Sequence, residues 1–176
     1  IFSGGGTLGH VLPNMVIIDK LKKNGFDVRY VGTANSMEEK ACLENGVKFY
    51  QTTAVKLDKT RPIQNLKIPF LLPPAVNKTK KILKKIKPDL VFTKGGYVSL
   101  PVVLAAKSLK IPQICHESDA SLGIVNQIAY KLGATVLTAE NCSFNCGTKV
   151  GIPLKPDLFT TKKAKVMANG KPTVLI

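Results

Sequence analysis

Apolar residues follow two alternating patterns along the chain: short runs typical of buried strands, and longer runs with helical spacing. Val11, Met15 and Ile18 lie one helical turn apart and predict a helix over residues 11–23, after a short strand at residues 1–2. The same patterns predict strands at 27–31, 47–52, 89–93, 111–115, 134–138 and 149–150, and helices at 36–44, 77–87, 101–109 and 122–132. Strands that alternate with helices favour a parallel, doubly wound α/β sheet.

Two helix starts and one irregular segment refine this pattern. Ser36 and Glu39 have the spacing of a capping box, and Ser121 is expected to cap the helix that starts at Leu122. Residues 55–74 are rich in proline and mix apolar with basic residues, so they predict no clean helix.

Polar residues gather directly after three of the predicted strands. These loops are Gly4–His10, Gly95–Ser99 and His116–Asp119. The carboxyl ends of parallel strands line one crevice, so we expect the three loops to converge there. Members of these loops also have simpler interpretations. His116 and Glu117 could hydrogen-bond the sheet edge, and Asp119 could be a turn or cap residue. Tyr97 could be only a packed ring with its hydroxyl in water.

The first loop reads Ser-Gly-Gly-Gly-Thr-Leu-Gly-His over residues 3–10. A strand that runs into a glycine turn at a helix start can bind phosphate through free N–H groups and the helix dipole. The loop lacks the Gly-Lys-Ser/Thr ending of a P-loop, and His10 stands where a dinucleotide fingerprint has its third glycine. His10 is therefore either a packing residue at the helix start or a proton acceptor beside a phosphate site.

Composition describes an ordinary globular domain. The 176 residues include 44% hydrophobic positions, and the longest apolar runs fall far short of the ~20 residues that span a bilayer. The four cysteines are scattered, so we expect reduced thiols in a cytoplasmic protein, with neither a disulfide scaffold nor a metal site. The chain begins inside an apparent strand without a methionine and ends in what looks like the start of another, so we expect a fragment of a longer protein.

The net charge of +15 is the unusual compositional feature. Ten Lys/Arg residues and one Asp fall between residues 55 and 87, so +9 of the charge lies there. Apolar residues interleaved with lysines favour a surface that meets anionic lipid headgroups, although a solvated helix face would have the same composition. We do not expect nucleic acid as a partner, because Phe70 is the segment's only stacking residue and Arg61 its only arginine.

Five segments resemble one enzyme family in the right order. They are Gly-Gly-Gly-Thr-Leu-Gly-His-Val-Leu-Pro (4–13), Val-Gly-Thr-Ala-Asn-Ser-Met-Glu (31–38), Lys-Pro-Asp-Leu-Val (87–91), Gly-Gly-Tyr-Val-Ser-Leu-Pro (95–101) and His-Glu-Ser-Asp-Ala-Ser-Leu-Gly-Ile-Val-Asn (116–126). The chain thus resembles the N-terminal half of the MurG-type N-acetylglucosaminyltransferases of glycosyltransferase family 28.

The resemblance implies a GT-B architecture of two Rossmann-like domains. Residues 1–158 would form the acceptor and membrane-association domain, and residues 159–176 a linker and the first strand of the donor domain. The family transfers GlcNAc from UDP-GlcNAc to the C4 hydroxyl of undecaprenyl-pyrophosphoryl-MurNAc-pentapeptide (lipid I to lipid II) in peptidoglycan synthesis, which supports cell shape and division. It inverts the anomeric carbon, uses no cofactor or metal, and works as a peripheral enzyme at the cytoplasmic face of the cell membrane. The acceptor half alone is expected to be inactive.

Motif matching assigns roles to individual residues. His10 would be the catalytic base, with Glu117 as the alternative base or as its orienting partner. The donor would be bound by Thr7, Leu8, Gly9, Asp119 and Lys155, and the acceptor pyrophosphate by Gly5, Gly6, Gly95, Gly96, Tyr97, Ser99 and Asn126. The membrane would be met by Leu66, Lys67, Phe70, Leu71, Lys78 and Lys81.

Three residues depart from the family pattern and affect the expected donor contacts. Leu8 replaces a motif glycine, Asp119 stands where an asparagine is frequent, and Lys155 replaces an arginine with a point charge. Two other functions stay open from the sequence: the acceptor half of another lipid-directed GT-B transferase, and a non-enzymatic basic module that binds membranes.

Overall fold

The computed structural model describes residues 1–56, 66–141 and 147–154. It contains one parallel sheet with the strand order β3-β2-β1-β4-β5-β6-β7. In chain order the strands are β1 (Phe2–Ser3), β2 (Arg29–Thr33), β3 (Lys48–Thr52), β4 (Val91–Thr93), β5 (Gln113–Glu117), β6 (Thr135–Thr138) and β7 (Thr148–Lys149). The predicted doubly wound α/β fold is confirmed.

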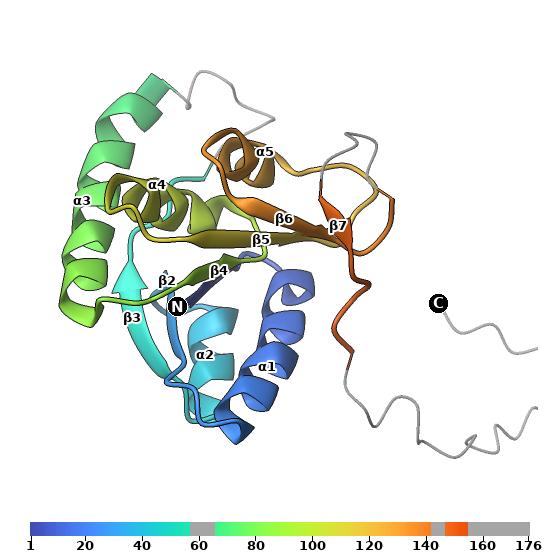
Figure 1. Cartoon of the computed structure of the whole chain (residues 1–176). Coiled ribbons are helices and arrows are strands. Elements are labelled where there is room, and N and C mark those ends of the chain that lie inside the picture. Colours follow the sequence, from blue (N-terminus) through green and yellow to red (C-terminus); the bar gives the residue numbers. More distant parts are fainter. Residues whose placement is uncertain (57–65, 142–146, 155–176) are drawn as a thin grey trace, which may run out of the picture.

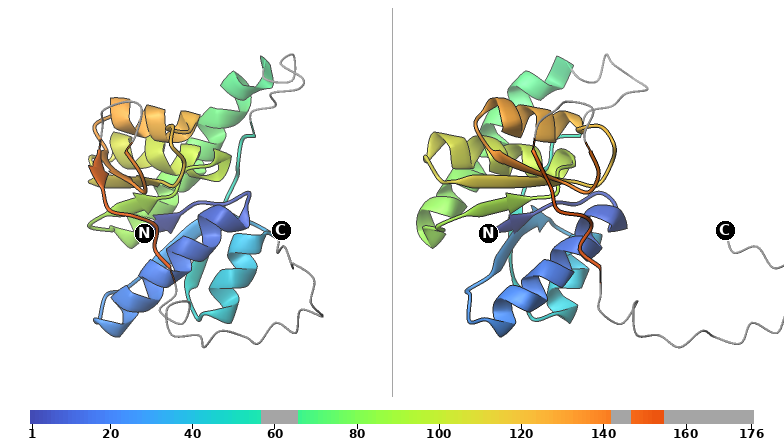
Figure 2. Two further views of the ribbon diagram at one scale, coloured as in Figure 1. Left: turned by 90° about the vertical axis from the view of Figure 1, so that its right-hand side faces the viewer. Right: turned by 45° about the vertical axis from the view of Figure 1, so that its right-hand side comes forward.

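Helices cover both faces of the sheet (Figures 1 and 2). One face carries α1 (Leu8–Lys23) and α2 (Met37–Glu44), and the other carries α3 (Ile68–Ile86), α4 (Leu100–Ser108) and α5 (Ile124–Lys131). A short 3₁₀ helix, η2 (Tyr97–Ser99), leads into α4. The chain winds outward from β1 in one direction through β2 and β3, and then in the other direction from β4. The carboxyl ends of β1 and β4 therefore form the topological switch point, where ligands bind in sheets of this kind.

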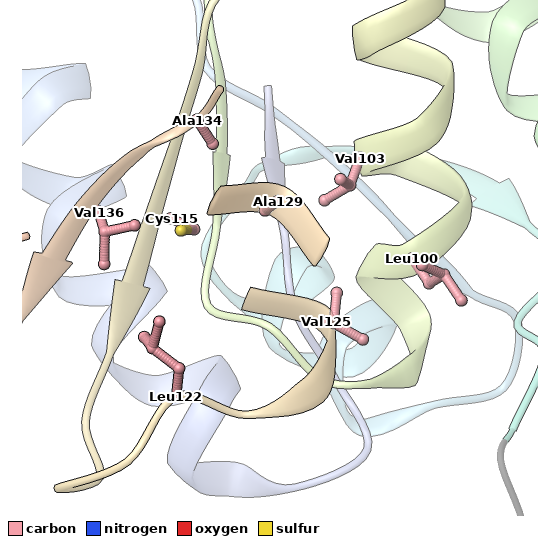
Figure 3. Close-up of a cluster of buried hydrophobic side chains, with 8 residues drawn as sticks. All are labelled: Leu100, Val103, Cys115, Leu122, Val125, Ala129, Ala134 and Val136. Atoms are coloured by element: carbon pink, nitrogen blue, oxygen red, sulfur yellow. The ribbon is translucent and has the colours of Figure 1, made fainter. Parts of the chain in front are cut away.

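The core has a layer on each face of the sheet. On the side of α1 and α2 it includes Val11, Ile18 and Tyr30. On the other side, side chains from α4, β5, α5 and β6, and from the residues just before α5 and β6, gather into the cluster that Figure 3 shows. This cluster consists of Leu100, Val103, Cys115, Leu122, Val125, Ala129, Ala134 and Val136. This burial holds the strand ends, and with them the polar loops, in fixed positions.

Cys42 and Cys115 are buried, and neither takes part in a disulfide within the described residues. Burial raises the pKa of the Cys42 thiol to about 12, so this group is inert at neutral pH. Cys142 and Cys146 lie outside the described residues.

Helix α3 corrects one expectation. It begins at Ile68, nine residues before the predicted start at residue 77, and it contains Pro73 and Pro74. Ala75, Thr79 and Leu83 are buried at four-residue spacing along it, and the Thr79 hydroxyl lies 2.6 Å from that of Thr52 on β3. Packing of this continuous face offsets the backbone hydrogen bonds that the prolines remove.

Two predicted caps have different outcomes. The Ser36 hydroxyl accepts from the Glu39 N–H at 3.2 Å and caps α2, while the Glu39 carboxylate accepts from Asn35 N–H at 2.6 Å instead of completing the box at Ser36. Ser121 does not cap α5, because that helix starts two residues later, with Gly123 at the N-cap position.

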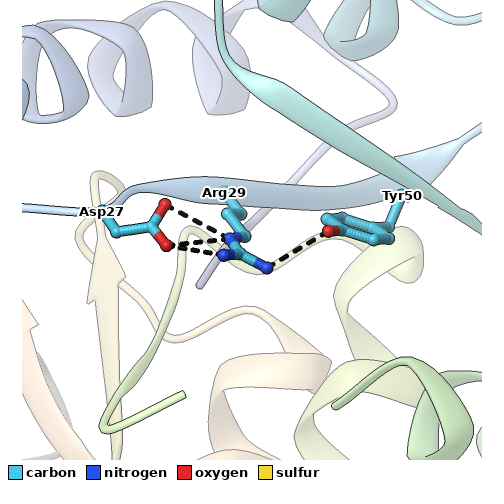
Figure 4. A network of polar contacts seen from close by, with 3 residues as sticks. All are labelled: Asp27, Arg29 and Tyr50. Atoms are coloured by element: carbon cyan, nitrogen blue, oxygen red, sulfur yellow. Dashed lines mark hydrogen bonds and ion pairs between the residues drawn. The ribbon is translucent and has the colours of Figure 1, made fainter. Parts of the chain in front are cut away.

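A polar network ties β2 to β3 at the end of the sheet opposite the glycine loops (Figure 4). The Arg29 guanidinium donates to both oxygens of Asp27, with 2.6 Å for the shortest contact, and to the Tyr50 hydroxyl at 3.2 Å. These hydrogen bonds hold the pKa of Asp27 below its usual range.

Candidate functional site

The first glycine loop joins β1 to the start of α1 at the switch point. The Tyr30 hydroxyl donates to the Gly4 carbonyl, and Asn14 on α1 donates to that hydroxyl at 3.0 Å. The carboxylate of Glu38 packs directly against Gly5, since a Cβ built on Gly5 would come 2.6 Å from it. Buried side chains of α1, β2 and α2 thus hold the loop in place.

His10 lies in the first turn of α1 and is half-buried. Its Nδ1 is 3.2 Å from the Gly5 carbonyl oxygen and 3.1 Å from Thr7 Oγ1. A carbonyl oxygen can only accept, so the neutral ring carries its proton on Nδ1 and keeps the lone pair on Nε2. Nothing in the described part of the chain hydrogen-bonds Nε2, which leaves it as the proton acceptor of the ring.

The second glycine loop packs against the first, backbone to backbone. Gly96 has φ +78°, and a Cβ there would lie 2.7 Å from the Gly5 oxygen and 3.3 Å from His10 Nδ1. Gly6 has φ +85°, and a Cβ there would lie 2.7 Å from the Tyr97 ring. Only glycine fits both positions. The predicted convergence of these two loops is confirmed, and His10 stands at their junction.

The residues around the second loop differ in what they expose. Tyr97 is half-buried with its ring against Gly6. Ser99 is fully buried and donates to the Gly95 carbonyl at 2.8 Å, so its hydroxyl shapes the loop. The side-chain amide of Asn126, on α5, lies against Gly95, since a Cβ built on Gly95 would come 3.0 Å from it.

The third group of polar residues is partly in the sheet. His116 and Glu117 are the last residues of β5 and are buried, whereas the sequence placed them in a loop after the strand. The Glu117 carboxylate accepts four hydrogen bonds, from the N–H groups of Ser118, Asp119 and Gly123 and from the Asn126 amide, at 2.8 to 3.1 Å. This carboxylate anchors the start of α5, a role that Ser121 was expected to fill.

Lys94 is a site residue to which the sequence assigned no role. It lies between β4 and Gly95, is only 1% exposed, and donates to His116 Nδ1 at 2.6 Å and to Ser118 Oγ. His116 Nε2 lies 2.8 Å from the Gly151 carbonyl, so Nε2 carries the proton and Nδ1 accepts from Lys94. A basic residue between a buried strand and a Gly-Gly turn was the available signal.

Burial governs the ionisation of this pair. Desolvation lowers the pKa of Lys94 to about 8, although Glu117 and Asp119 act through space to raise it. Burial also lowers the pKa of His116, against the hydrogen bond to Gly151. At neutral pH, Lys94 is therefore mostly a cation and His116 is neutral.

Four buried side-chain oxygens have no partner within the described ranges. They belong to Ser3, Asn14, Thr93 and Asn126. Ser3 and Thr93 are paired in register at the carboxyl ends of β1 and β4, and the two asparagines lie on helices beside these ends. Unpaired buried polar groups are rare in native folds and each needs an explanation, so their gathering here supports the switch point as the candidate site.

Four of the residues expected to contact the donor are exposed: Thr7, Leu8, Gly9 and Asp119. Leu8, at 53% exposure, is the first residue of α1 and has no left-handed backbone, so replacing the motif glycine creates no strain there. Lys155 and residues 159–176 lie outside the described residues.

The residues expected to meet a membrane lie on α3 and directly before it. Leu66, Phe70 and Leu71, at its N-terminal end, are 71%, 80% and 52% exposed. Lys67 next to them is exposed, as are Lys78 and Lys81 further along the helix. Among the helices of the described ranges, none combines the length and the apolar character needed to cross a bilayer. The same ranges hold no group of three or more His, Cys, Asp or Glu residues arranged to bind a metal.

Two hollows lie away from the glycine loops. One, of about 340 Å³, is at the opposite end of the sheet, where Ile1, Phe26 and Leu90 line it. The other is a groove of about 1000 Å³ between α1 and α2, and Pro153 and Leu154 border it. None of the residues placed at the switch point lines either hollow.

Comparison with known proteins assigns the family. The model of the glycosyltransferase family 28 N-terminal domain matches residues 1–138. A relative from Clostridium novyi, named UDP-N-acetylglucosamine--N-acetylmuramyl-(pentapeptide) pyrophosphoryl-undecaprenol N-acetylglucosamine transferase, is 38% identical over 94% of this chain and 48% of its own length. A relative of the same name from Lachnospira eligens is 36% identical over 100% of this chain and 52% of its own length. The chain thus spans about half the length of the curated relatives it matches.

Solved structures agree with this assignment. The crystal structure of Acinetobacter baumannii MurG superposes with a TM-score of 0.73 at 30% identity, over 85% of this chain and 43% of that one. The glycosyltransferase SnogD from Streptomyces nogalater superposes with a TM-score of 0.55 at 19% identity, over 79% of this chain and 42% of its own, which shows the shared fold alone. The fold is the Rossmann-like N-terminal domain of GT-B glycosyltransferases. Motifs, fold and relatives lead to one conclusion: the chain belongs to glycosyltransferase family 28.

Proposed function

We propose that this chain is the acceptor half of an inverting N-acetylglucosaminyltransferase of peptidoglycan synthesis. The full-length enzyme would transfer GlcNAc from UDP-GlcNAc to the C4 hydroxyl of undecaprenyl-pyrophosphoryl-MurNAc-pentapeptide. The observation that carries the proposal is the position of His10 at the junction of the two glycine loops, with Nε2 unoccupied. The relatives named for this reaction support the choice of substrates.

In this mechanism His10 acts as general base. The C4 hydroxyl of MurNAc gives its proton to Nε2 while its oxygen attacks the anomeric carbon of GlcNAc. The bond from that carbon to the UDP oxygen breaks, and UDP leaves with the electron pair from the opposite face, which inverts the configuration. The Gly5 carbonyl stabilises the ring once it is protonated, because it accepts from Nδ1–H at 3.2 Å.

Glu117 is the weaker candidate for the base. Its four hydrogen bonds all come from N–H donors and fix its carboxylate at the start of α5, so its oxygens are already occupied. We assign Glu117 a positioning role.

The loops at Gly5, Gly6, Gly95 and Gly96 would receive the acceptor pyrophosphate on their backbone N–H groups, beside Tyr97 and Asn126. Thr7, Leu8, Gly9, Asp119 and Lys155 remain the expected donor contacts.

We also propose that the enzyme is peripheral at the cytoplasmic face of the membrane. The N-terminal end of α3 would insert Leu66, Phe70 and Leu71 among the lipid headgroups, and its lysines would meet anionic lipids. A lipid-linked acceptor would then reach the site from the surface on which the protein rests.

The test replaces His10 with alanine in the full-length protein. Transfer of labelled GlcNAc to the lipid acceptor should fall by roughly 10²-fold to 10⁴-fold, because the general base is lost. Binding of UDP-GlcNAc, measured by calorimetry, should change little. Asp19→Ala, which alters an exposed residue two to three turns further along α1, should leave both unchanged. Near-normal turnover of His10→Ala would remove His10 as the base.

The full-length wild type tests the reaction itself. Transfer from UDP-GlcNAc to the lipid-linked MurNAc-pentapeptide is the expected result. Transfer only to a different lipid-linked acceptor would favour another lipid-directed GT-B transferase, and binding to anionic vesicles without any transfer would favour a basic membrane module.

A further inference from the structure

We propose that Lys94 and Ser118 form a further part of the ligand site, in which buried Lys94 fixes the Ser118 hydroxyl so that its hydrogen is free for a phosphate oxygen of a substrate. The proposal rests on the proposed function and adds two residues that the sequence motifs did not assign. Its ligand chemistry is a phosphate diester or diphosphate, from either the nucleotide sugar or the lipid acceptor.

The hydrogen-bond directions in this cluster are determined by chemistry. His116 Nε2–H donates to the Gly151 carbonyl at 2.8 Å, so Nδ1 can only accept from Lys94, at 2.6 Å. An ammonium group cannot accept, so the Ser118 oxygen accepts from Lys94 and its own hydrogen must point elsewhere. Within the described residues that hydrogen has no acceptor.

The location of the cluster favours an anion. The backbone N–H of Lys94 donates to the Ser3 carbonyl at 3.1 Å, and a Cβ built on Gly4 would lie 3.1 Å from Lys94 Cβ. Lys94 therefore contacts the first glycine loop and directly precedes the second. Ser118 is half-buried and follows β5, next along the same edge of the sheet. Both neighbouring loops are glycine turns that precede helices, a backbone arrangement that binds phosphate through N–H groups, so a donated O–H here would add to such a site.

The charge of Lys94 is not matched by a contacting carboxylate. None of the ion pairs in the described part of the chain includes it, and Glu117 turns its oxygens towards N–H donors on α5 and its preceding loop. Asp119 and Glu117 act on Lys94 only through space. A buried cation without a contact ion pair is costly to keep, and an anionic ligand nearby would offset this cost.

The experiment compares Ser118→Ala, Lys94→Met and the double variant in the full-length protein. Each single variant should raise the KM for one of the two substrates roughly tenfold, because the loss of one charge-assisted hydrogen bond weakens binding by about that factor. The kcat should change much less. The double variant should be no worse than the more affected single variant, because both changes remove the same contact. UDP-GlcNAc and the lipid acceptor are varied in separate arms, so the affected KM identifies which phosphate is bound.

A second measurement does not depend on turnover. Binding of inorganic pyrophosphate, followed by calorimetry, should weaken by a similar factor in Ser118→Ala and in Lys94→Met. Lys107→Met is the matched control, because Lys107 is an exposed lysine that donates to the Leu132 carbonyl at 2.6 Å. It should leave pyrophosphate affinity and both KM values unchanged.

The outcomes separate this proposal from the reaction. If Lys94→Met lowers only the unfolding midpoint while pyrophosphate affinity and both KM values stay at wild-type levels, Lys94 is purely structural and the proposal is wrong. If Lys94→Met does not fold, Ser118→Ala decides alone, and its wild-type behaviour in both measurements rejects the proposal. If the wild type shows no transfer, the proposed function fails, while the pyrophosphate measurement still tests Lys94 and Ser118.

Discussion

At the scale of single residues, the polar groups of the site fall into two classes. Glu117 and Ser99 have their hydrogen bonds satisfied within the protein and hold the backbone in place. His10 Nε2 and the Ser118 hydroxyl hydrogen have no partner in the described residues, so they are available to a ligand. The first class fixes the backbone of the loops, and the second provides groups that can act on a ligand.

A substitution at Gly5 tests how closely the first glycine loop is packed. Gly5→Ala should destabilise the fold by about 1 to 3 kcal/mol, because the new Cβ would lie 2.6 Å from the buried Glu38 carboxylate. Gly9→Ala is the matched control, since the nearest atom to its Cβ would be Thr7 Oγ1 at 3.7 Å. Alanine is also favoured over glycine in a helix, so Gly9→Ala should be neutral or slightly stabilising. Unfolding in urea measures both, and equal midpoints would contradict the close packing of Gly5.

At the scale of elements, the helix starts show how local and distant groups compete. Ser36 caps α2 from within its own sequence, and this pattern is visible in the sequence. The start of α5 is held by Glu117, six residues before Gly123 in the chain and at the end of β5. The second arrangement exists only once the strand and the helix have packed together.

The two serines make this difference measurable. Ser36→Ala should cost about 1 kcal/mol of unfolding free energy, because the Glu39 N–H loses its acceptor. Ser121→Ala should stay within about 0.5 kcal/mol of wild type, because Ser121 is exposed and is not the cap. Chemical denaturation of both variants at one pH gives the comparison. A larger loss for Ser121→Ala would restore it as the cap of α5.

At the scale of the whole molecule, charge and exposed apolar surface coincide at one place. The segment 55–87 carries +9 of the net +15, and its described part contains the exposed end of α3. The candidate site lies at the carboxyl edge of the sheet. In the function that we propose, one domain would combine a surface that meets anionic lipid with a site that binds a lipid-linked diphosphate.

Membrane association can be tested by vesicle binding. A full-length variant that combines Leu66→Ser, Phe70→Ser and Leu71→Ser should be released from vesicles rich in anionic lipid, because the inserted apolar area is lost. The substitutions Lys78→Glu and Lys81→Glu should each weaken vesicle binding by about fivefold or more, mainly at low salt. Leu43→Ser alters a leucine on α2 that is 73% exposed and should bind as wild type. Sedimentation with vesicles measures all of these, and unchanged binding of the serine variant would reject α3 as the docking surface.

Most of the fold could be predicted from the sequence, since strand and helix periodicities are local. The chain order of strands and helices, the cap at Ser36 and the convergence of the two glycine loops all follow from such signals. The early start of α3 did not follow, because Pro73 and Pro74 break the local pattern and only burial of Ala75, Thr79 and Leu83 offsets them. The extension of β5 through Glu117 was missed for a similar reason, since polar residues are buried there.

The sequence by itself determined the doubly wound fold and the family, and it predicts a catalytic role for His10 beside a glycine loop. The tertiary structure alone decided which polar groups are occupied and which are available. Lys94 meets His116 across 22 positions of the chain, and His116 meets Gly151 across 35. Such contacts depend on which strand ends lie side by side and how deeply each is buried, and no local periodicity records either property.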